Sequence, residues 1–328
     1  VGEVNEIIEL HEQELLALQS GAKASTQFDA GDLAVQFVKD LGKSERQGSK
    51  THIEDLDEII GSLRIGQMGV IGGRPSMGKS ALALKIAFNN AMRGVPVAYL
   101  SFDMTDEEVT TRLLSMAVFH LKAKNVTYKD IDRNNLSQEQ RAWVSEAAFW
   151  LRELPLKFET KRGLNVPQIV SVIRKIKADL KKQDLKLGLV FLDHLQKVQP
   201  IKSGVRDTAA ATYNIEALKD AAQIIGAPLW VLCQLNRSVE TQEDKRPSMK
   251  DLRETGAIEQ EANIIIFVYW DAYYLTRDMP QDKNSAEYQD RALLLEDAWN
   301  KYLILPRKVR SGSIKDIEIY VDMTTNEF

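Results

Sequence analysis

The sequence contains a single cysteine, Cys233, among its 328 residues. One cysteine excludes an intrachain disulfide framework and is typical of a reducing cytoplasm. Cys233 lies in an apolar run, so we interpret it as a buried structural thiol. The sequence also lacks an apolar run of about 18 residues and a secretory signal pattern, so we predict a cytoplasmic protein without a membrane span. The first residue is Val1 and not methionine, which indicates a trimmed or processed chain.

The sequence also has no excess of positive charge. Lys and Arg number 43 against 47 Asp and Glu, which gives a net charge of −4. A chain with this balance has no global field that attracts nucleic acid, so any such contact must come from local basic loops. No internal repeat or low-complexity tract is present, and the 44% hydrophobic content is enough for a sizeable core. We therefore expect one large globular domain with an appendage.

Residues 1–50 differ in pattern from the rest of the chain. Apolar residues recur along 4–18 at helical spacing, which predicts a helix with one apolar seam. A second short helix is predicted over 29–41, and a connector rich in Gly, Ser and charge follows over 42–50. We therefore divide the chain into 1–50, a linker helix with a flexible connector, and 51–328, one α/β domain. The apolar seam docks either on a neighbouring subunit or back on its own domain, and the sequence leaves both open.

After the connector, short apolar runs alternate with helical patterns. Several runs are apolar on both faces, which is typical of strands in a parallel sheet that is covered on both sides. Capping boxes at Thr105 with Glu108 and at Ser137 with Gln140 mark helix starts, and Pro167 fits the first turn of another helix. The predicted fold is α/β, with a mostly parallel sheet and helices on both faces. The predicted strands are 67–72, 95–102, 154–159, 187–192, 227–235 and 263–269.

The last part of the chain departs from this alternation. Residues 302–323 have the pattern of two consecutive strands, so a C-terminal β-hairpin is predicted there. A tight basic turn at Ser311 and Gly312 is expected to join the two strands.

One short stretch carries a specific chemical signal. The residues GRPSMGKS, from Gly73 to Ser80, fit the pattern G-x-x-x-x-G-K-[S/T] at every position, with an apolar strand before them and a helical pattern after them. In such a loop the backbone N–H groups face a phosphate, and the dipole of the following helix adds positive charge. Lys79 is expected to reach the β and γ phosphates, and the Ser80 hydroxyl to bind magnesium. The predicted nucleotide-binding residues are Gly73, Arg74, Pro75, Ser76, Met77, Gly78, Lys79, Ser80 and Ala81.

Polar residues at the ends of other predicted strands complete this site. Magnesium needs a second anchor, and Asp193 supplies a carboxylate at the end of LVFLD. Ligands of such sheets lie beyond the carboxyl ends of the strands, so Asp103 and Gln234 are also expected at the site. Asp103 is a candidate base that orients the attacking water, and Gln234 is expected to bond the γ phosphate. A capping or loop role is the alternative for each of these side chains.

With these motifs in place, the chain resembles the DnaB-type replicative DNA helicases, which belong to the RecA-like ATPase group. The resemblance covers residues 51–328 and rests on GRPSMGKSALAL, LVFLDHLQ, CQLNRSVE and KRPSMKDLRETGAIEQEAN, which occur in the family's order. It implies a homo-hexameric ring that moves 5′ to 3′ along single-stranded DNA and hydrolyses ATP, or another NTP, with Mg²⁺ at the subunit interfaces. A helicase loader and primase are partners that the family implies, but the primase-binding N-terminal domain is expected to be largely absent here.

The resemblance gives Asp193, Gln234 and the phosphate loop the roles described above. It also adds two residues from RKVRSG. Arg310 matches the arginine that enters the neighbouring subunit's site, and Lys308 matches the lysine beside it. Such an arginine contributes on the order of a thousandfold or more to the rate. A solvated basic hairpin is the alternative for both residues.

The resemblance also implies two DNA-facing loops that hold the phosphates of one strand. Phosphate contacts carry no base preference, and they predict steep salt dependence. In the second loop Asp207 stands where the family has a basic residue. The DNA-binding residues that the resemblance implies are Arg253, Glu254 and Gly256 in one loop and Lys202 and Arg206 in the other.

Two further departures from the family concern the chemistry and the shape. The family has glutamate where this chain has Asp103, and a misplacement of about 1 Å costs roughly a hundredfold in rate. The stretch 275–300 is longer than in the family, and an extra surface helix is expected there.

Two alternative functions stay open at this point. A ring that grips DNA with weak hydrolysis is consistent with Asp103. A RecA-like ATPase that acts on protein would share the fold, although the loop over 245–263 favours DNA.

Overall fold

The computed structural model describes residues 29–39, 48–121, 126–200, 207–252, 255–310, 312 and 314–328. The chain divides into two units, residues 1–46 and 47–328, and each is described by itself. In the first unit, α2 (Ala30–Lys39) confirms the short helix predicted over 29–41, and its Val35, Phe37 and Val38 side chains are exposed. The helix predicted over 4–18 and most of the connector lie outside the described residues, so their roles stay predictions.

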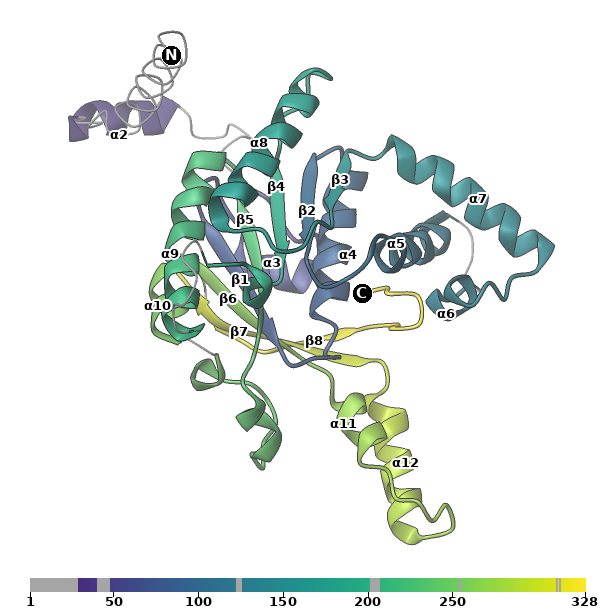
Figure 1. Ribbon diagram of the computed structural model, residues 1–328. Coiled ribbons are helices and arrows are strands. Elements are labelled where there is room, and N and C mark those ends of the chain that lie inside the picture. Colours follow the sequence, from purple (N-terminus) through teal and green to yellow (C-terminus); the bar gives the residue numbers. More distant parts are fainter. Residues whose placement is uncertain are drawn as a thin grey trace, which may run out of the picture. The chain divides into compact units, whose positions relative to one another are not determined.

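The second unit is built on one eight-stranded sheet with the order β3-β2-β4-β5-β1-β6-β7-β8 (Figure 1). The pairs among β1 to β6 are all parallel, and β7 and β8 are added antiparallel at one edge. A mostly parallel sheet is therefore confirmed. The strands are β1 (Met68–Gly73), β2 (Val97–Ser101), β3 (Leu156–Glu159), β4 (Leu189–Asp193), β5 (Leu229–Gln234), β6 (Ile264–Tyr269), β7 (Lys301–Val309) and β8 (Ile317–Tyr320).

Helices cover both faces of this sheet, with α4 and α5 on one side and α8 and α9 on the other (Figure 1). The predicted capping boxes are present at Thr105 and Ser137, and Asn165 forms another at the start of α8. The helices are α3 (Glu54–Ile60), α4 (Lys79–Met92), α5 (Asp106–Leu121), α6 (Tyr128–Asp132), α7 (Gln138–Glu153), α8 (Val166–Lys181), α9 (Asp207–Ile225), α10 (Thr255–Glu261), α11 (Asp271–Arg277) and α12 (Ala286–Ala298), with 3₁₀ turns η2 (Leu195–Lys197), η3 (Arg237–Thr241) and η4 (Met249–Asp251).

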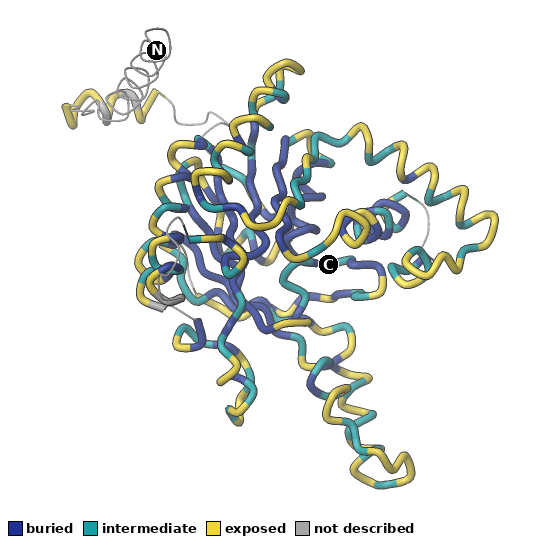
Figure 2. The backbone as a smooth tube through the Cα atoms, in the orientation of Figure 1, coloured by how far each residue is buried: buried dark blue, intermediate teal, exposed yellow. Residues whose placement is uncertain are grey.

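The core lies in the central strands and the helix faces that cover them (Figure 2). Every residue of β1, β2, β4 and β6 is buried, as the doubly apolar runs predicted. Cys233 is fully buried in β5, which agrees with a structural thiol. Among the described residues, no helix combines the length and the apolar character that crossing a membrane requires.

The C-terminal strands differ from the predicted hairpin in their connection. They pair only over Lys301–Ile304 and Ile317–Tyr320, and the rest of β7 pairs with β6. The prediction of a tight turn at Ser311 and Gly312 is therefore wrong, because the chain leaves the β7–β8 ladder several residues before that point. Ser311 itself lies outside the described residues.

The stretch 275–300 contains the additional surface helix that was expected, α12. Together α11 and α12 form a projection beyond the ends of β6 and β7, which we call the arm, residues 271–299 (Figure 1). The arm is held at its base by Trp270, whose ring meets Trp299 edge to face and whose Nε1 donates to the Trp299 carbonyl at 3.0 Å.

Candidate functional site

The phosphate-loop pattern forms a tight loop between β1 and α4. Ser76 and Gly78 have positive φ angles of 65° and 76°. A Cβ on Gly78 would lie 2.9 Å from Met323 Cε and 3.0 Å from the Tyr302 hydroxyl. The Tyr302 hydroxyl in turn donates to the Met77 carbonyl at 2.7 Å. A glycine here is therefore favoured both by the backbone conformation and by the close approach of the buried Tyr302 and the partly buried Met323.

A cavity of about 430 Å³ lies at the carboxyl ends of the central strands. It brings together most of the residues that sequence motifs placed at a nucleotide site, although they come from four separate segments. Gly73, Arg74 and Met77 do not line it, so they would contribute only through the loop backbone. The predicted residues that do line it are Pro75, Ser76, Gly78, Lys79, Ser80, Ala81, Asp103, Asp193 and Gln234.

Lys79 enters this cavity from the first turn of α4. Its Nζ donates to the Arg74 carbonyl at 3.0 Å, so the loop itself holds the ammonium group. Burial lowers the Lys79 pKa to about 8, and the negative charge of Asp193 partly opposes that shift. In the described part of the chain this ammonium is bonded to a carbonyl and forms no ion pair, so a triphosphate would supply its anionic partner.

Asp193 ends β4 and is only 2% exposed. Its Oδ2 accepts a hydrogen bond from the Tyr99 hydroxyl at 2.8 Å, and Tyr99 lies on the neighbouring strand β2. Burial raises the pKa of Tyr99, with Asp193 adding to the shift, so Tyr99 stays a proton donor at neutral pH. The tyrosine therefore fixes the direction of the carboxylate.

Gln234 ends β5, and its backbone is held by Gln196 from η2. The Gln234 N–H donates to Gln196 Oε1 at 3.0 Å, and Gln196 Nε2 donates back to the Gln234 carbonyl at 3.3 Å. The position of Gln234 is thus tied to the turn that follows Asp193. Gln196 lies within the motif LVFLDHLQ, but its contact with β5 depends on the strand order.

Asp103 follows β2 at the rim of the cavity and is exposed. Its carboxylate forms an ion pair with Lys197 at 3.2 Å, and its carbonyl accepts from Arg162 at 2.9 Å. Lys197 therefore competes with any attacking water for the Asp103 carboxylate.

Several cavity residues have no signal in the sequence. Arg112 from α5 donates to Asn326 at 2.9 Å and stacks on Tyr128, and the last residues of the chain fold back beside it. The approach of the C-terminus to α5 depends on the path of the whole chain, so spacing along the sequence does not indicate it. The cavity residues that sequence reasoning missed are Met104, Arg112, His194, Trp270, Met323 and Asn326.

Lys308 and Arg310 lie far from the cavity of their own chain. Val309 pairs with Ile264, the first residue of β6, whereas Trp270 at the other end of β6 lines the cavity. The two ends of that strand are roughly 17 Å apart. Lys308 Nζ donates to the Glu259 carbonyl, and Arg310 donates to the Gln260 carbonyl at 3.2 Å. Neither side chain can serve the cavity of its own subunit.

The predicted DNA-binding residues are mostly beyond what the structure describes. Arg253, Glu254, Lys202 and Arg206 lie outside the described residues. Gly256 is exposed in the first turn of α10, and a Cβ there would meet no atom within 4 Å.

The donor set of the cavity fits a magnesium ion that is carried by a phosphate. Such an ion takes oxygen ligands and needs only one or two from the protein, which Ser80 and the fixed Asp193 carboxylate provide. In the described part of the chain, no cluster of three or more His, Cys, Asp and Glu could hold a metal by itself. The site therefore suits an ion that arrives with a nucleotide.

Comparisons with known proteins agree with this geometry. The model of one protein family, the DnaB-like helicase C terminal domain, matches residues 48–328. The chain is 31% identical over 294 residues to the "Replicative DNA helicase DnaB" of Rickettsia felis, which is 86% of this chain and 57% of that protein. It is 27% identical over 332 residues to the protein of the same name from Helicobacter pylori, covering 98% of this chain and 65% of that one. The chain thus spans little more than half of the Rickettsia relative.

Two solved structures share the fold. One, described as an "ATPase Domain", superposes with a TM-score of 0.75 at 26% identity, covering 92% of this chain and 98% of that one. A structure of "a DnaB-like replicative helicase and its interactions with primase" has a TM-score of 0.73 at 25% identity, covering 97% of this chain and 71% of that one.

Proposed function

We propose that this chain, which belongs to the family of the DnaB-like helicase C terminal domain, is the ATP-driven motor of a ring-shaped replicative DNA helicase. The observation that carries the proposal is the cavity in which Lys79, Ser80, Asp193 and Gln234 meet at the ends of parallel strands. Relatives named as replicative DNA helicases support the biological role. The predicted cytoplasmic location remains part of this proposal.

The proposed chemistry is hydrolysis of ATP or another NTP. The loop amides and Lys79 hold the phosphates, and Gln234 contacts the γ phosphate from the end of β5. Ser80 and Asp193 hold Mg²⁺, which neutralises phosphate charge when it is bound. Asp103 orients the attacking water from the rim, where Lys197 competes with that water for its carboxylate.

The active particle is proposed to be a homo-hexamer. The support is that Lys308 and Arg310 lie at the amino end of β6, whereas their own cavity lies at its carboxyl end, so they are placed to act on a neighbouring subunit. An arginine that enters from a neighbour stabilises the charge of the transition state, which makes hydrolysis depend on assembly.

The proposed substrate track is single-stranded DNA, held by Arg253, Glu254 and Gly256, with Lys202 and Arg206 as a second loop. A few cations from each subunit, repeated around a ring, would line one channel without making the chain basic overall. Binding to an oligonucleotide is expected to weaken steeply with salt, because phosphate contacts release counterions. The similarity to a structure whose description names primase supports primase as a further partner, and the family resemblance adds a helicase loader to the proposal.

The decisive experiment compares ATP hydrolysis by the chain and by Lys79→Ala, each with and without single-stranded DNA. We expect DNA-stimulated turnover that the substitution abolishes. Equal rates for the two proteins would refute the motor. Nucleotide-dependent DNA binding with negligible turnover would indicate a gripping ring, and hydrolysis without DNA binding at low salt would indicate an ATPase that acts on protein.

A further inference from the structure

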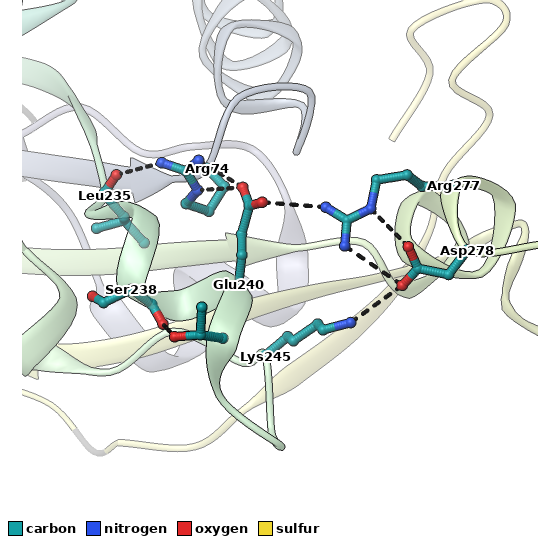
Figure 3. Close-up of polar contacts among 8 residues, drawn as sticks. Arg74, Leu235, Ser238, Glu240, Lys245, Arg277 and Asp278 are labelled. Carbon is teal, nitrogen blue, oxygen red and sulfur yellow. Dashed lines mark hydrogen bonds and ion pairs between the residues drawn. The ribbon is translucent and has the colours of Figure 1, made fainter.

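Arg74 is a residue of the phosphate loop whose side chain does not line the cavity. Its guanidinium is almost fully buried and makes three hydrogen bonds (Figure 3). Nε and one terminal nitrogen donate to Glu240 Oε1 at 3.0 and 2.6 Å, and the other terminal nitrogen donates to the Leu235 carbonyl at 2.8 Å. The loop is thereby fastened to the segment that follows Gln234.

Glu240 lies in η3 and uses its second oxygen for a residue of the arm. Arg277, at the end of α11, donates to Glu240 Oε2 at 3.3 Å (Figure 3). The hydrogen bond from Arg74 lowers the pKa of Glu240, and the charge of Arg277 adds to the shift. One carboxylate therefore bridges two cations, one in the phosphate loop and one in the arm.

The arm holds Arg277 in place from several sides. Asp278 accepts from Arg277 Nε at 2.8 Å and from Lys245 at 3.3 Å. The guanidinium carbon of Arg277 lies 5.0 Å from the centre of the Tyr274 ring and 5.9 Å from that of Tyr273. Arg277 is thus oriented by aromatic rings and a carboxylate of the arm itself, so a movement of α11 would move it relative to Glu240.

Arg74 also controls the lysine of the site through its own backbone. The Arg74 carbonyl accepts from Lys79 Nζ at 3.0 Å and from the Met77 N–H at 3.3 Å. A buried guanidinium that loses its carboxylate is costly, so Arg74 would leave its position and take this carbonyl with it. The preorganisation of the loop for phosphate depends on the bond between Arg74 and Glu240.

We propose that Glu240 and Arg277 are positioning residues for the phosphate loop, and that through them the arm sets how tightly the site holds nucleotide. Glu240 acts through Arg74, and Arg277 acts through Glu240. The inference rests on the nucleotide site proposed above and deepens it, because it assigns regulation of that site to the arm.

The test measures the Kd of a fluorescent ATP analogue with Mg²⁺, and separately kcat at saturating ATP, for Glu240→Gln and Arg277→Gln. Glu240→Gln is expected to raise Kd roughly tenfold, since it removes a charge-assisted bond to a buried cation. Arg277→Gln is expected to raise Kd about threefold, the scale of a partly exposed ion pair. Arg277→Lys should recover most of that loss, and kcat should change little in each variant.

A double variant shows whether the two residues act in series. If Arg277 works only through Glu240, the variant with both substitutions binds nucleotide no more weakly than Glu240→Gln alone. Lys301→Gln is the matched control, because it breaks an exposed ion pair with Asp297 of the same arm at 2.6 Å, and neither partner is bonded to Arg74 or Glu240. Its Kd should equal that of the unchanged chain.

An unchanged Kd for Glu240→Gln, with a lowered unfolding temperature, would overturn the proposal and leave a purely structural ion pair. If the effects of Glu240→Gln and Arg277→Gln on Kd are additive, Arg277 does not act through Glu240, and the role of the arm in the proposal is refuted. Arg277 is exposed, so its variants test the arm even if Glu240→Gln fails to fold. Lys79→Ala distinguishes a failure of the nucleotide site from a failure of the positioning role. If Lys79→Ala binds nucleotide as well as the unchanged chain, the proposed nucleotide site is wrong. If Lys79→Ala loses binding while Glu240→Gln binds normally, only the positioning role of Glu240 is refuted.

Discussion

At the scale of single residues, the rim of the cavity is where we expect this chain to differ from its family. Asp103 is one methylene shorter than the glutamate that the family resemblance implies, and it is paired with Lys197 at 3.2 Å. If the Asp103 carboxylate does not fully reach the attacking water, hydrolysis is slower while nucleotide binding is unchanged.

The first prediction concerns this position. Asp103→Glu is expected to raise kcat by up to about a hundredfold, because the added methylene recovers about 1 Å of reach. KM for ATP should change little, since Asp103 does not hold the phosphates. Steady-state hydrolysis with DNA present checks this, with Asp103→Asn as the inactive reference. A kcat that stays constant in Asp103→Glu would remove Asp103 from the chemistry.

The second prediction concerns the pH dependence of stability. The pKa of Glu240 is lowered by Arg74, so its stabilising contribution is present above the ordinary glutamate pKa of about 4.3 and is lost as pH falls through the lowered value. The free energy of unfolding of the chain should therefore exceed that of Glu240→Gln at neutral pH, and the difference should shrink in acid. Urea unfolding of both proteins over a pH series measures it. A difference that grows in acid would have the wrong sign.

At the scale of elements, the loop between β1 and α4 carries the strictest geometric demand. Gly78 and Gly94 offer a natural comparison, because their φ angles are 76° and 77°, but a Cβ on Gly94 would meet nothing within 4 Å. The two positions therefore share a backbone cost and differ in surroundings.

The third prediction uses this pair. Gly94→Ala is expected to lose about 1 kcal/mol of stability from left-handed strain alone. Gly78→Ala should lose more, because its Cβ meets Met323 and Tyr302, and it should also weaken nucleotide binding by more than about tenfold. Denaturant unfolding and nucleotide titration of both variants check this. Equal losses of stability at the two positions would show that Met323 and Tyr302 move aside for the added Cβ at no cost.

Sequence patterns predicted the elements well where the physics is local. Doubly apolar runs predicted the buried strands, and the spacing of Gly73, Gly78 and Lys79 predicted the loop, because backbone conformation and phosphate chemistry act over a few residues. The parallel order of the strands then placed Asp193 and Gln234 together at the carboxyl ends of β4 and β5. The β7–β8 connection was predicted wrongly, because sequence pattern does not show that Leu305 to Val309 pair with β6 instead of β8.

What the sequence did not indicate depends on contacts between distant segments. Asn326 reaches the cavity only because the C-terminus folds back to Arg112, 214 positions earlier in the chain. The bond between Arg74 and Glu240 spans 166 positions and joins two motifs, GRPSMGKS and CQLNRSVE, whose contact residue spacing does not indicate. Such contacts follow from the strand order and the packing of loops, for which residue spacing carries no signal.

At the scale of the whole molecule, the sheet separates two groups that we expect to act in one reaction. The cavity lies at the carboxyl ends of the parallel strands, and Lys308 and Arg310 lie at the amino end of β6. Each catalytic centre is therefore expected to combine Lys79 of one subunit with Arg310 of the next.

The fourth prediction follows from this division. Lys79→Ala and Arg310→Ala should each abolish hydrolysis alone, with an expected loss on the order of a thousandfold for Arg310→Ala. Mixing the two variants should restore part of the activity, because some interfaces then pair an intact Lys79 with an intact Arg310. Hydrolysis measured against the mixing ratio checks this. Full activity of Arg310→Ala in assembled particles would exclude a shared centre.

Arg310 lies at the opposite end of the parallel strands from Lys79. If Arg310 acts on a neighbouring subunit, the rate of hydrolysis per molecule also falls on dilution. A solitary subunit would have half of the proposed catalytic centre, so it would be expected to hold a nucleotide without turning it over. Turnover per molecule should therefore climb with concentration until every copy has a neighbour. Unassembled subunits would then hydrolyse no ATP, and no separate inhibitor would be needed to suppress their hydrolysis.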